Sequence, residues 1–217
     1  MSTTDSVFDP LAEKYDTWYD TKGKTAFETE LAALRPLLPE LPGPWLEVGV
    51  GTGRFAQALG IPSGIDPSEA LLAIARGRGI NVLPCRGEKM PFEDGSFGTL
   101  FLLTTWAFLQ DPGKVLTECR RVLADDGRLV NGYLDRDGKW AAGYMEKGKT
   151  GHPLFSHARF PTFDEVETAS QQTGFQILKT FSTLFQGPDE TSSVEEPKQG
   201  YVPGASFVVI VASLSGS

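Results

Sequence analysis

The part of the chain best suited to chemistry contains three glycines at alternate positions, Gly49, Gly51 and Gly53. An apolar run, 45–48, precedes them and carries one acid, Glu47, and an amphipathic segment follows over 54–59. This order predicts a buried strand, a tight turn and a helix N-terminus, where a ligand can lie against bare main-chain N–H groups. Because Glu47 would repel a phosphate and attract an ammonium, the turn favours a ligand whose nearest part carries an amine.

Three further features are expected at the ends of neighbouring strands. Asp66 ends a short predicted strand, where an acid can accept hydrogen bonds from ribose hydroxyls or serve as a helix cap. Glu88 lies in the segment 86–92, which either contacts an adenine ring or forms an ordinary turn. Thr104 and Trp106 follow the next strand, where substrate and cofactor would meet, although Trp106 is equally suited to core packing.

Two cofactor classes compete for the glycine turn. Residues 51–56, Gly-Thr-Gly-Arg-Phe-Ala, fit the permissive dinucleotide fingerprint, which would indicate a nicotinamide-dependent oxidoreductase. Glu47 fits a pyrophosphate poorly but an aminoacyl tail well, and therefore favours a cofactor with such a tail.

The elements that position these residues follow from the spacing of apolar and turn residues. Strands are predicted at 45–48, 64–66, 81–84, 97–103, 128–134, 175–180 and 207–212. Helices are predicted at 27–38, 54–59, 67–76, 112–123 and 163–173. This alternation predicts a mainly parallel sheet with helices on both faces. The last two strands have no clear helix between them, so we expect them to pair antiparallel, with a surface loop over 186–203.

Composition limits the possible partners. A chain of 217 residues fits one domain, and no apolar run is long enough to span a membrane. The first ten residues lack the pattern of a signal peptide, so we expect a cytoplasmic protein, monomeric or homodimeric. The net charge of -8 and the dispersed basic residues argue against a nucleic-acid partner. Neither Cys85 nor Cys119 has a partner at metal-ligand spacing, so no metal site is predicted.

Several motifs together resemble class I S-adenosylmethionine-dependent methyltransferases, in particular the small-molecule branch that includes the ubiquinone/menaquinone-biosynthesis enzymes. The resemblance covers about residues 40–135. Its segments are Glu47-Val-Gly-Val-Gly-Thr-Gly53, Gly64-Ile-Asp-Pro-Ser68, Glu88-Lys-Met-Pro-Phe92, Asp94-Gly-Ser-Phe97, Leu109-Gln-Asp-Pro112 and Glu118-Cys-Arg-Arg-Val-Leu123.

The resemblance implies a Rossmann-like three-layer αβα sandwich with a seven-stranded, mainly parallel sheet and an antiparallel last strand. The whole chain, 1–217, would be one methyltransferase domain. Residues 1–30 would form an N-terminal lid, 40–135 the cofactor-binding core, and 136–217 the substrate side and the C-terminal strands.

The resemblance also assigns the methionine end of S-adenosylmethionine, whose product is S-adenosylhomocysteine. Gly49, Gly51 and Gly53 would let the methionine portion approach the backbone. Glu47 would help to anchor its amino end, and Thr104 would line its side.

The nucleoside end is assigned in the same way. Asp66 would hold the ribose hydroxyls, with Pro67 and Ser68 beside the adenosine. Glu88 would lie near the adenine amine, and the backbone of Lys89 near a ring nitrogen.

Catalysis needs a base only if the acceptor must lose a proton. His152 and His157 are candidates, although a surface or structural role is favoured for both because the sequence pairs neither with a carboxylate. Tyr15 and Tyr19 look well placed to fold over the cofactor, with Tyr15 as a cofactor contact and Tyr19 as a weak catalytic candidate. The alternative is a helix that packs outside the sheet.

The acceptor is not specified by the sequence. No Asn-Pro-Pro-Tyr-type segment follows the fourth strand, so the resemblance gives no support for methylation of a nucleobase or a glutamine amide. Aromatic residues over 140–163 either form a pocket for a small molecule or pack in the core. A small-molecule methyltransferase is the leading hypothesis. A non-catalytic S-adenosylmethionine-binding protein and a nicotinamide-dependent oxidoreductase remain as alternatives.

Overall fold

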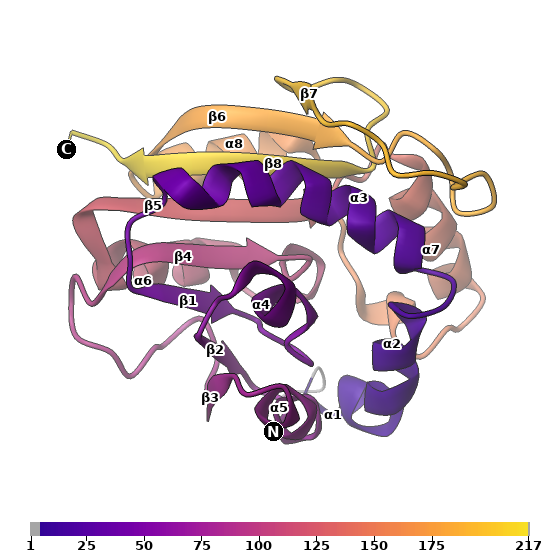
Figure 1. Ribbon diagram of the computed structural model, residues 1–217, viewed down its shortest axis with the longest axis horizontal. Coiled ribbons are helices and arrows are strands. Elements are labelled where there is room, and N and C mark those ends of the chain that lie inside the picture. Colours follow the sequence, from indigo (N-terminus) through magenta and orange to yellow (C-terminus); the bar gives the residue numbers. More distant parts are fainter. Residues whose placement is uncertain (1–4, 217) are drawn as a thin grey trace.

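A mixed sheet of eight described strands forms the middle layer of the protein (Figure 1). The computed structural model describes residues 5–216, so residues 1–4 of the predicted lid segment lie outside it. The strand order across the sheet is β3 (Asn81–Pro84), β2 (Ser63–Asp66), β1 (Trp45–Val48), β4 (Phe97–Leu103), β5 (Leu123–Leu134), β8 (Phe207–Leu214), β6 (Phe175–Thr183) and β7 (Lys198–Gln199).

The strand directions confirm the predicted fold class. Strands β1 to β5 run parallel, and β8 runs antiparallel between β5 and β6. The sheet has eight described strands rather than seven, because the segment predicted as a surface loop contains β7. This short strand pairs with Phe181 and Ser182 of β6. A strand of two residues has no readable periodicity, so the sequence could not indicate it.

Helices cover both faces of the sheet, as the alternating pattern predicted. One face carries α3 (Lys24–Leu34), α4 (Arg54–Leu59) and α5 (Glu69–Gly77), whose apolar residues share one core cluster. The other face carries α6 (Pro112–Val122) and α8 (Phe163–Gln172), which share a second cluster. Figure 1 shows α3 and α4 in front of the sheet and α6 and α8 behind it.

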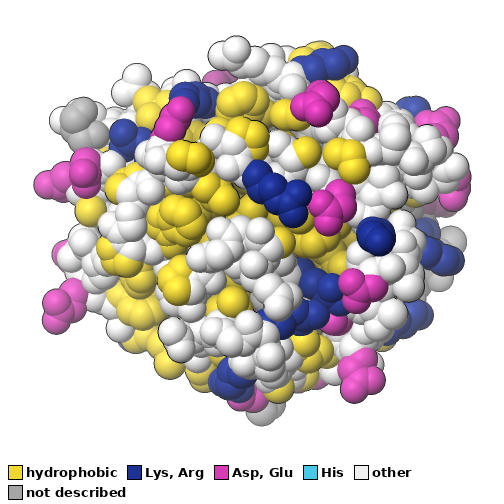
Figure 2. Space-filling model, viewed as in Figure 1, with side chains coloured by type: hydrophobic (Ala, Val, Ile, Leu, Met, Phe, Trp, Pro, Cys, Tyr) yellow, Lys and Arg dark blue, Asp and Glu magenta, His cyan; other side chains and the backbone are white. Residues whose placement is uncertain are grey.

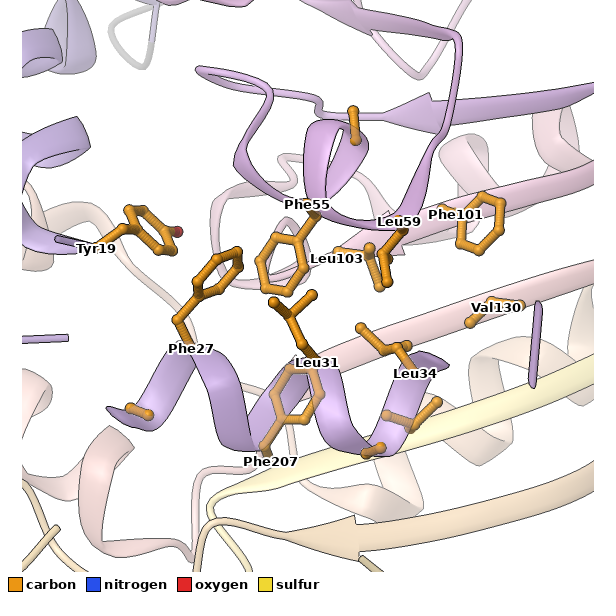
Figure 3. Close-up of a cluster of buried hydrophobic side chains, with 14 of the residues drawn as sticks. Tyr19, Phe27, Leu31, Leu34, Phe55, Leu59, Phe101, Leu103, Val130 and Phe207 are labelled. Carbon is orange, nitrogen blue, oxygen red and sulfur yellow. The ribbon is translucent and has the colours of Figure 1, made fainter. Parts of the chain in front are cut away.

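The cluster in Figure 3 fixes α3 against α4 and the sheet. Phe27 and Leu31 of α3 point toward Phe55 of α4, and the rings of Phe27 and Phe55 lie 5.0 Å apart. Leu103 of β4 and Phe207 of β8 belong to the same cluster. This packing determines which residues α3 presents to the carboxyl ends of the strands.

Local chemistry explains where the helices begin and end. The Ser68 hydroxyl accepts a hydrogen bond from the N–H of Leu71 and caps α5. Asp111 caps α6, which begins at a proline, and a capping box of Thr162 and Glu165 starts α8. The α-helix predicted over 27–38 instead ends at Leu34 and continues as the 3-10 helix η2 (Arg35–Glu40), because Pro36 and Pro39 cannot donate backbone hydrogen bonds.

Elements that the sequence reasoning did not predict cover the carboxyl ends of the strands. They are α1 (Asp5–Phe8), the 3-10 helix η1 (Asp9–Leu11), α2 (Ala12–Trp18) and α7 (Lys139–Lys149). The rings of Trp18 in α2 and Trp140 in α7 lie 6.0 Å apart, so these two helices meet across the end of the sheet. Two glycines inside α7, Gly143 and Gly148, weaken its helical signal in the sequence. Over residues 5–216, no helix combines the length and apolarity that crossing a membrane requires.

Candidate functional site

A cavity of about 100 Å³ lies at the carboxyl ends of β1, β2 and β4. This is the end of a parallel sheet at which ligands bind in open α/β folds. Eight of the eleven residues predicted to bind the cofactor line it: Tyr15, Gly49, Gly51, Asp66, Pro67, Ser68, Glu88 and Thr104.

The glycine turn forms one wall of this cavity through backbone that other residues rarely adopt. Gly49 and Gly51 have φ angles of 80° and 52°. A side chain at Gly49 would come within 2.3 Å of Thr105, whereas the space beside Gly51 is open. The turn is held to β2 because the N–H groups of Gly49 and Val50 both donate to the carbonyl of Ile65.

Asp66 joins the turn to the start of α5. Its Oδ2 accepts a hydrogen bond from the N–H of Gly51 at 3.0 Å, and its Oδ1 accepts one from the N–H of Ser68 at 2.9 Å. Ser68 is the helix cap, and its hydroxyl also donates to Asp9 of η1 at 2.6 Å. Asp66 therefore has a role different from simple helix capping, and it faces the cavity.

Glu47 does not line the cavity. It is 1% exposed, and its carboxyl accepts a hydrogen bond from the N–H of Ala56 at the start of α4. Its Oε2 has no hydrogen-bond partner among the described residues. Burial, and then the nearby Asp66, raise the pKa of Glu47 well above its usual range. Its position fits an indirect influence on the turn, as the resemblance implied.

Gly53 and Lys89 also lie outside the cavity lining. Gly53 is the N-cap of α4 with a φ angle of 79°. The N–H of Lys89 donates to the carbonyl of Arg86 at 3.2 Å, so that amide belongs to a turn. Glu88 does line the cavity and is paired with Arg86 at 3.4 Å.

A second cavity of about 340 Å³ lies beside the first, under α2, α3 and α7. Its walls are mainly aromatic, and several come from the segment 140–163: Trp140, Tyr144, Phe155 and Phe160. Three residues line both cavities and form the wall between them: Tyr15, Thr104 and Phe108. This volume is within the usual range for small-molecule sites.

Thr104 occupies a strained position in the dividing wall. Its φ angle is 53°, which is uncommon for a residue other than glycine. Its N–H donates to the carbonyl of Gly132 in β5 at 2.7 Å, which holds this conformation in place. Such strain often occurs where the backbone is shaped for a ligand.

Tyr15 of α2 and Tyr19, the residue that follows the end of this helix, are linked near the same wall. Their hydroxyl oxygens lie 2.8 Å apart, and Tyr19 lines the second cavity. Burial raises the pKa of Tyr15 to about 12 and that of Tyr19 well above its ordinary value. Both side chains are therefore neutral hydroxyls at neutral pH.

Of the remaining candidates, His152 lies at one of the two cavities, whereas His157 and Trp106 do not. His152 lines the second cavity, and its Nδ1 accepts hydrogen bonds from the N–H groups of Leu154 and Phe155 at 3.2 and 3.4 Å. Burial lowers its pKa, with smaller effects from Lys14 and Lys147. His157 lines neither cavity. Trp106 is 6% exposed and packs in the second core cluster. Of its two predicted roles, core packing is therefore favoured over contact with a ligand.

Glu30 of α3 is a cavity residue that sequence reasoning missed. It is 4% exposed, lines the second cavity, and forms no hydrogen bond or ion pair within residues 5–216. Burial raises its pKa to about 8. A signal existed in its spacing, because Glu30 lies three residues after Phe27 and four before Leu34, on the apolar stripe of an amphipathic helix.

Ion pairs hold the N-terminal helix over both cavities. Asp16 of α2 pairs with Arg54 at 2.8 Å and with Arg78 at 2.7 Å, and Asp20 also pairs with Arg54. Burial opposes ionisation of Asp16, but hydrogen bonds from the two arginines outweigh it and lower its pKa to about 2. Tyr15 is thereby placed at the wall between the cavities. No group of three or more metal-ligating side chains occurs among the residues described.

Comparisons with known proteins agree with this geometry. A family model described as a methyltransferase domain matches residues 46–131. An uncharacterized protein of Mycobacterium tuberculosis is 42% identical over 93% of this chain and 71% of its own length. An uncharacterized protein of Methanocaldococcus jannaschii is 37% identical over 95% of this chain and 98% of its own.

A solved structure extends the likeness to the full fold. It is a crystal structure from Thermotoga maritima, described as a SAM-dependent methyltransferase and possible histamine N-methyltransferase. It matches with a TM-score of 0.88 and 37% sequence identity, over 97% of this chain and 99% of that chain.

Burial of Glu30 has a consequence for stability. Its pKa of about 8 in the folded protein exceeds the ordinary glutamate value of 4.5, so the folded state binds the extra proton between these values. The free energy of unfolding should therefore fall as pH rises from about 4.5 to 8, by roughly 2–5 kcal/mol for this group. Glu30→Gln should match the wild type at acidic pH and exceed its stability above pH 8, measured by urea unfolding. The control is Glu28→Gln on the same helix, whose half-exposed side chain pairs with Arg35, and this variant should keep the wild type's loss of stability as pH rises.

Proposed function

The chain belongs to the S-adenosylmethionine-dependent methyltransferases, and we propose that it methylates a small molecule bound in the second cavity. Membership of this family decides between the two cofactor classes in favour of S-adenosylmethionine. The observation that carries the proposal is the shared wall of Tyr15, Thr104 and Phe108 between the cavity at the glycine turn and the aromatic cavity.

The residues of the first cavity fit S-adenosylmethionine. Open space beside Gly51 leaves the turn accessible to the methionine portion, and Asp66 would accept hydrogen bonds from the ribose hydroxyls. Glu88 would lie near the adenine amine, and Pro67 and Ser68 beside the adenosine. These roles are proposals that agree with the cavity lining.

The chemistry then depends mainly on position. When bound, the cofactor supplies an electrophilic methyl group on a sulfonium leaving group. The protein has to hold the acceptor in line and exclude water, and such orientation can account for roughly 7–11 kcal/mol of a barrier in favourable systems. Tyr15 and Thr104 would define the opening through which the acceptor reaches the methyl group.

Surface charge supports a small acceptor rather than a nucleic acid. On the face shown in Figure 2, basic side chains are spread among acidic ones and form no broad patch. The chain carries a net charge of -8, whereas nucleic-acid binding relies on gathered Lys and Arg.

Two measurements test the proposed function. Calorimetry should show that the protein binds S-adenosylmethionine and S-adenosylhomocysteine but not NAD. Labelled S-adenosylmethionine should transfer its methyl group to a compound in a small-molecule metabolite extract. Cofactor binding with no transfer to any extract would instead support a non-catalytic S-adenosylmethionine-binding protein.

The role of Asp66 gives a first prediction for this site. Asp66→Asn keeps the shape of the side chain but removes its charge and one acceptor oxygen. The dissociation constant for S-adenosylmethionine should rise about tenfold or more, because hydrogen bonds to a charged group contribute roughly 1.5–3 kcal/mol. The exposed Glu69→Gln at the start of α5 is the control and should bind like the wild type. Equal affinities for both variants would exclude Asp66 as a cofactor contact.

We also propose that the N-terminal segment through α2 acts as a lid that orders on cofactor binding. It contacts the core through polar groups, with Asp16 on two arginines and Ser68 on Asp9, and through the rings of Phe8 on Phe108 and Trp18 on Trp140. A bound cofactor would add contacts to Tyr15 and would therefore favour the closed position of the segment. Protease cleavage within the first 30 or so residues should therefore slow when S-adenosylmethionine is added.

The ion pairs of the lid allow a matched test. Asp16→Asn removes a carboxylate whose side chain is 16% exposed and that pairs with both Arg54 and Arg78. Cleavage near the N-terminus should accelerate, and cofactor affinity should fall about tenfold. Asp20→Asn removes a carboxylate that is 64% exposed and pairs only with Arg54, so its effect should be smaller. Indistinguishable cleavage of wild type and Asp16→Asn would contradict this role.

A further inference from the structure

We propose that the methyl acceptor is an amine whose nitrogen lies beside Glu30, and that this carboxyl receives the proton that the amine must lose. This inference rests on the proposed function and names the class of its substrate. It also makes Glu30 a catalytic residue, since it would touch the acceptor.

The first support is the environment of the carboxyl. Glu30 is 4% exposed and lines the second cavity without a hydrogen bond or ion pair to any described residue. Glu47, a second deeply buried carboxyl, differs because it accepts a hydrogen bond from a backbone N–H and lines neither of these two cavities. A buried carboxyl without a partner costs free energy, and such groups are concentrated at functional sites. A cation in the cavity would provide the missing partner.

The walls around Glu30 are the second support. Trp18 and Trp140 meet edge to face at 6.0 Å, and Trp140 and Tyr144 at 5.9 Å. Tyr19 completes this group of rings on the cavity lining. Aromatic faces attract ammonium groups, most strongly where water is excluded. An aromatic cavity with one carboxylate therefore has the chemistry of an amine site.

The charged side chains on the lining of the second cavity determine the charge that a ligand would meet. Glu30 is the one Asp or Glu on the described lining. The tyrosines that interact with it electrostatically, Tyr15, Tyr19 and Tyr144, have pKa values raised mainly by burial and stay neutral. The cationic and histidine side chains of the lining are Lys14, Lys22, Lys147 and His152, and the three lysines are exposed to water.

Water screens the lysine charges, whereas Glu30 acts at short range inside the cavity. Burial lowers the pKa of His152, and the positive charges of Lys14 and Lys147 lower it further. It is therefore held neutral and adds no positive charge beside Glu30. The lining thus combines exposed lysines with one buried carboxyl, which becomes negative when it loses its proton.

The proton balance of the step is simple. An ammonium beside ionised Glu30 transfers one proton to the carboxyl, and the neutral nitrogen gains a lone pair. That pair forms the N–C bond as the S–C bond breaks and its electrons return to sulfur. The pKa of Glu30 in the empty cavity, about 8, is closer to that of an amine than an ordinary carboxyl pKa is, so burial makes this proton transfer less unfavourable.

The test compares amines with alcohols of the same shape. The probes are phenethylamine with phenethyl alcohol, and tryptamine with tryptophol, titrated into the full chain in the presence of S-adenosylhomocysteine. Wild type should bind at least one amine about tenfold more tightly than its alcohol. Glu30→Gln should lose this preference while binding the cofactor product normally, because Glu30 does not line the first cavity. Glu28→Gln should retain it.

Proton release gives a second readout, which a merely structural role of Glu30 would not change. Below pH 8, the carboxyl is mainly protonated, so binding of an ammonium should release about one proton from wild type. Calorimetry in two buffers of different ionisation enthalpy measures this release, which should disappear as pH rises above 8. Glu30→Gln should show no release that changes across this range.

The results separate this inference from the proposed function. Failure of wild type to bind S-adenosylmethionine overturns the proposed function itself. Normal cofactor binding without an amine preference in either pair of probes overturns the role of Glu30 alone. An amine preference that persists in Glu30→Gln, or proton release with no dependence on pH, also overturns it.

Discussion

The ion pairs among Asp16, Arg54 and Arg78 hold the N-terminal helix against the elements that carry the site. They connect α2, which precedes the sheet in the chain, to the first residue of α4 and the end of α5. Tyr15 is adjacent to Asp16 and lines both cavities, so the same contact places Tyr15 at the wall between them. Arg54 follows the glycine turn directly. Its ion pair with Asp16 therefore fixes the position of α2 relative to that turn.

Sheet topology explains why two cavities meet at Thr104. Parallel strands bring their carboxyl ends to one edge, and β4 lies between β1, which leads into the glycine turn, and β5. The chain must turn sharply there, and the N–H of Thr104 is held by Gly132 of β5 with a positive φ angle. This strained residue thus forms part of the wall between the two cavities.

The sequence was sufficient for the parts of the site that depend on local chemistry. Alternating glycines, apolar strands and the acid Asp66 each have a meaning within a few residues, and the sheet and the first cavity were predicted from them. Glu30 and α7 were not, because their roles depend on packing between distant segments. A Glu on the apolar stripe of α3 gains its meaning only where Trp18 and Trp140 meet across the end of the sheet. The two-residue strand β7 depends equally on its partner, β6.

The burial of Glu30 affects both the stability of the protein and the proposed preference of the second cavity for a cation. Burial penalises only the charged carboxyl, so the protonated form is accommodated by the surrounding rings at neutral pH. An uncharged molecule that fills the cavity leaves that form unchanged and gains no ionic attraction. A cation favours loss of the proton and then faces a carboxylate that water screens little. The same burial that destabilises the charged form therefore strengthens the discrimination between an amine and a neutral molecule of equal shape.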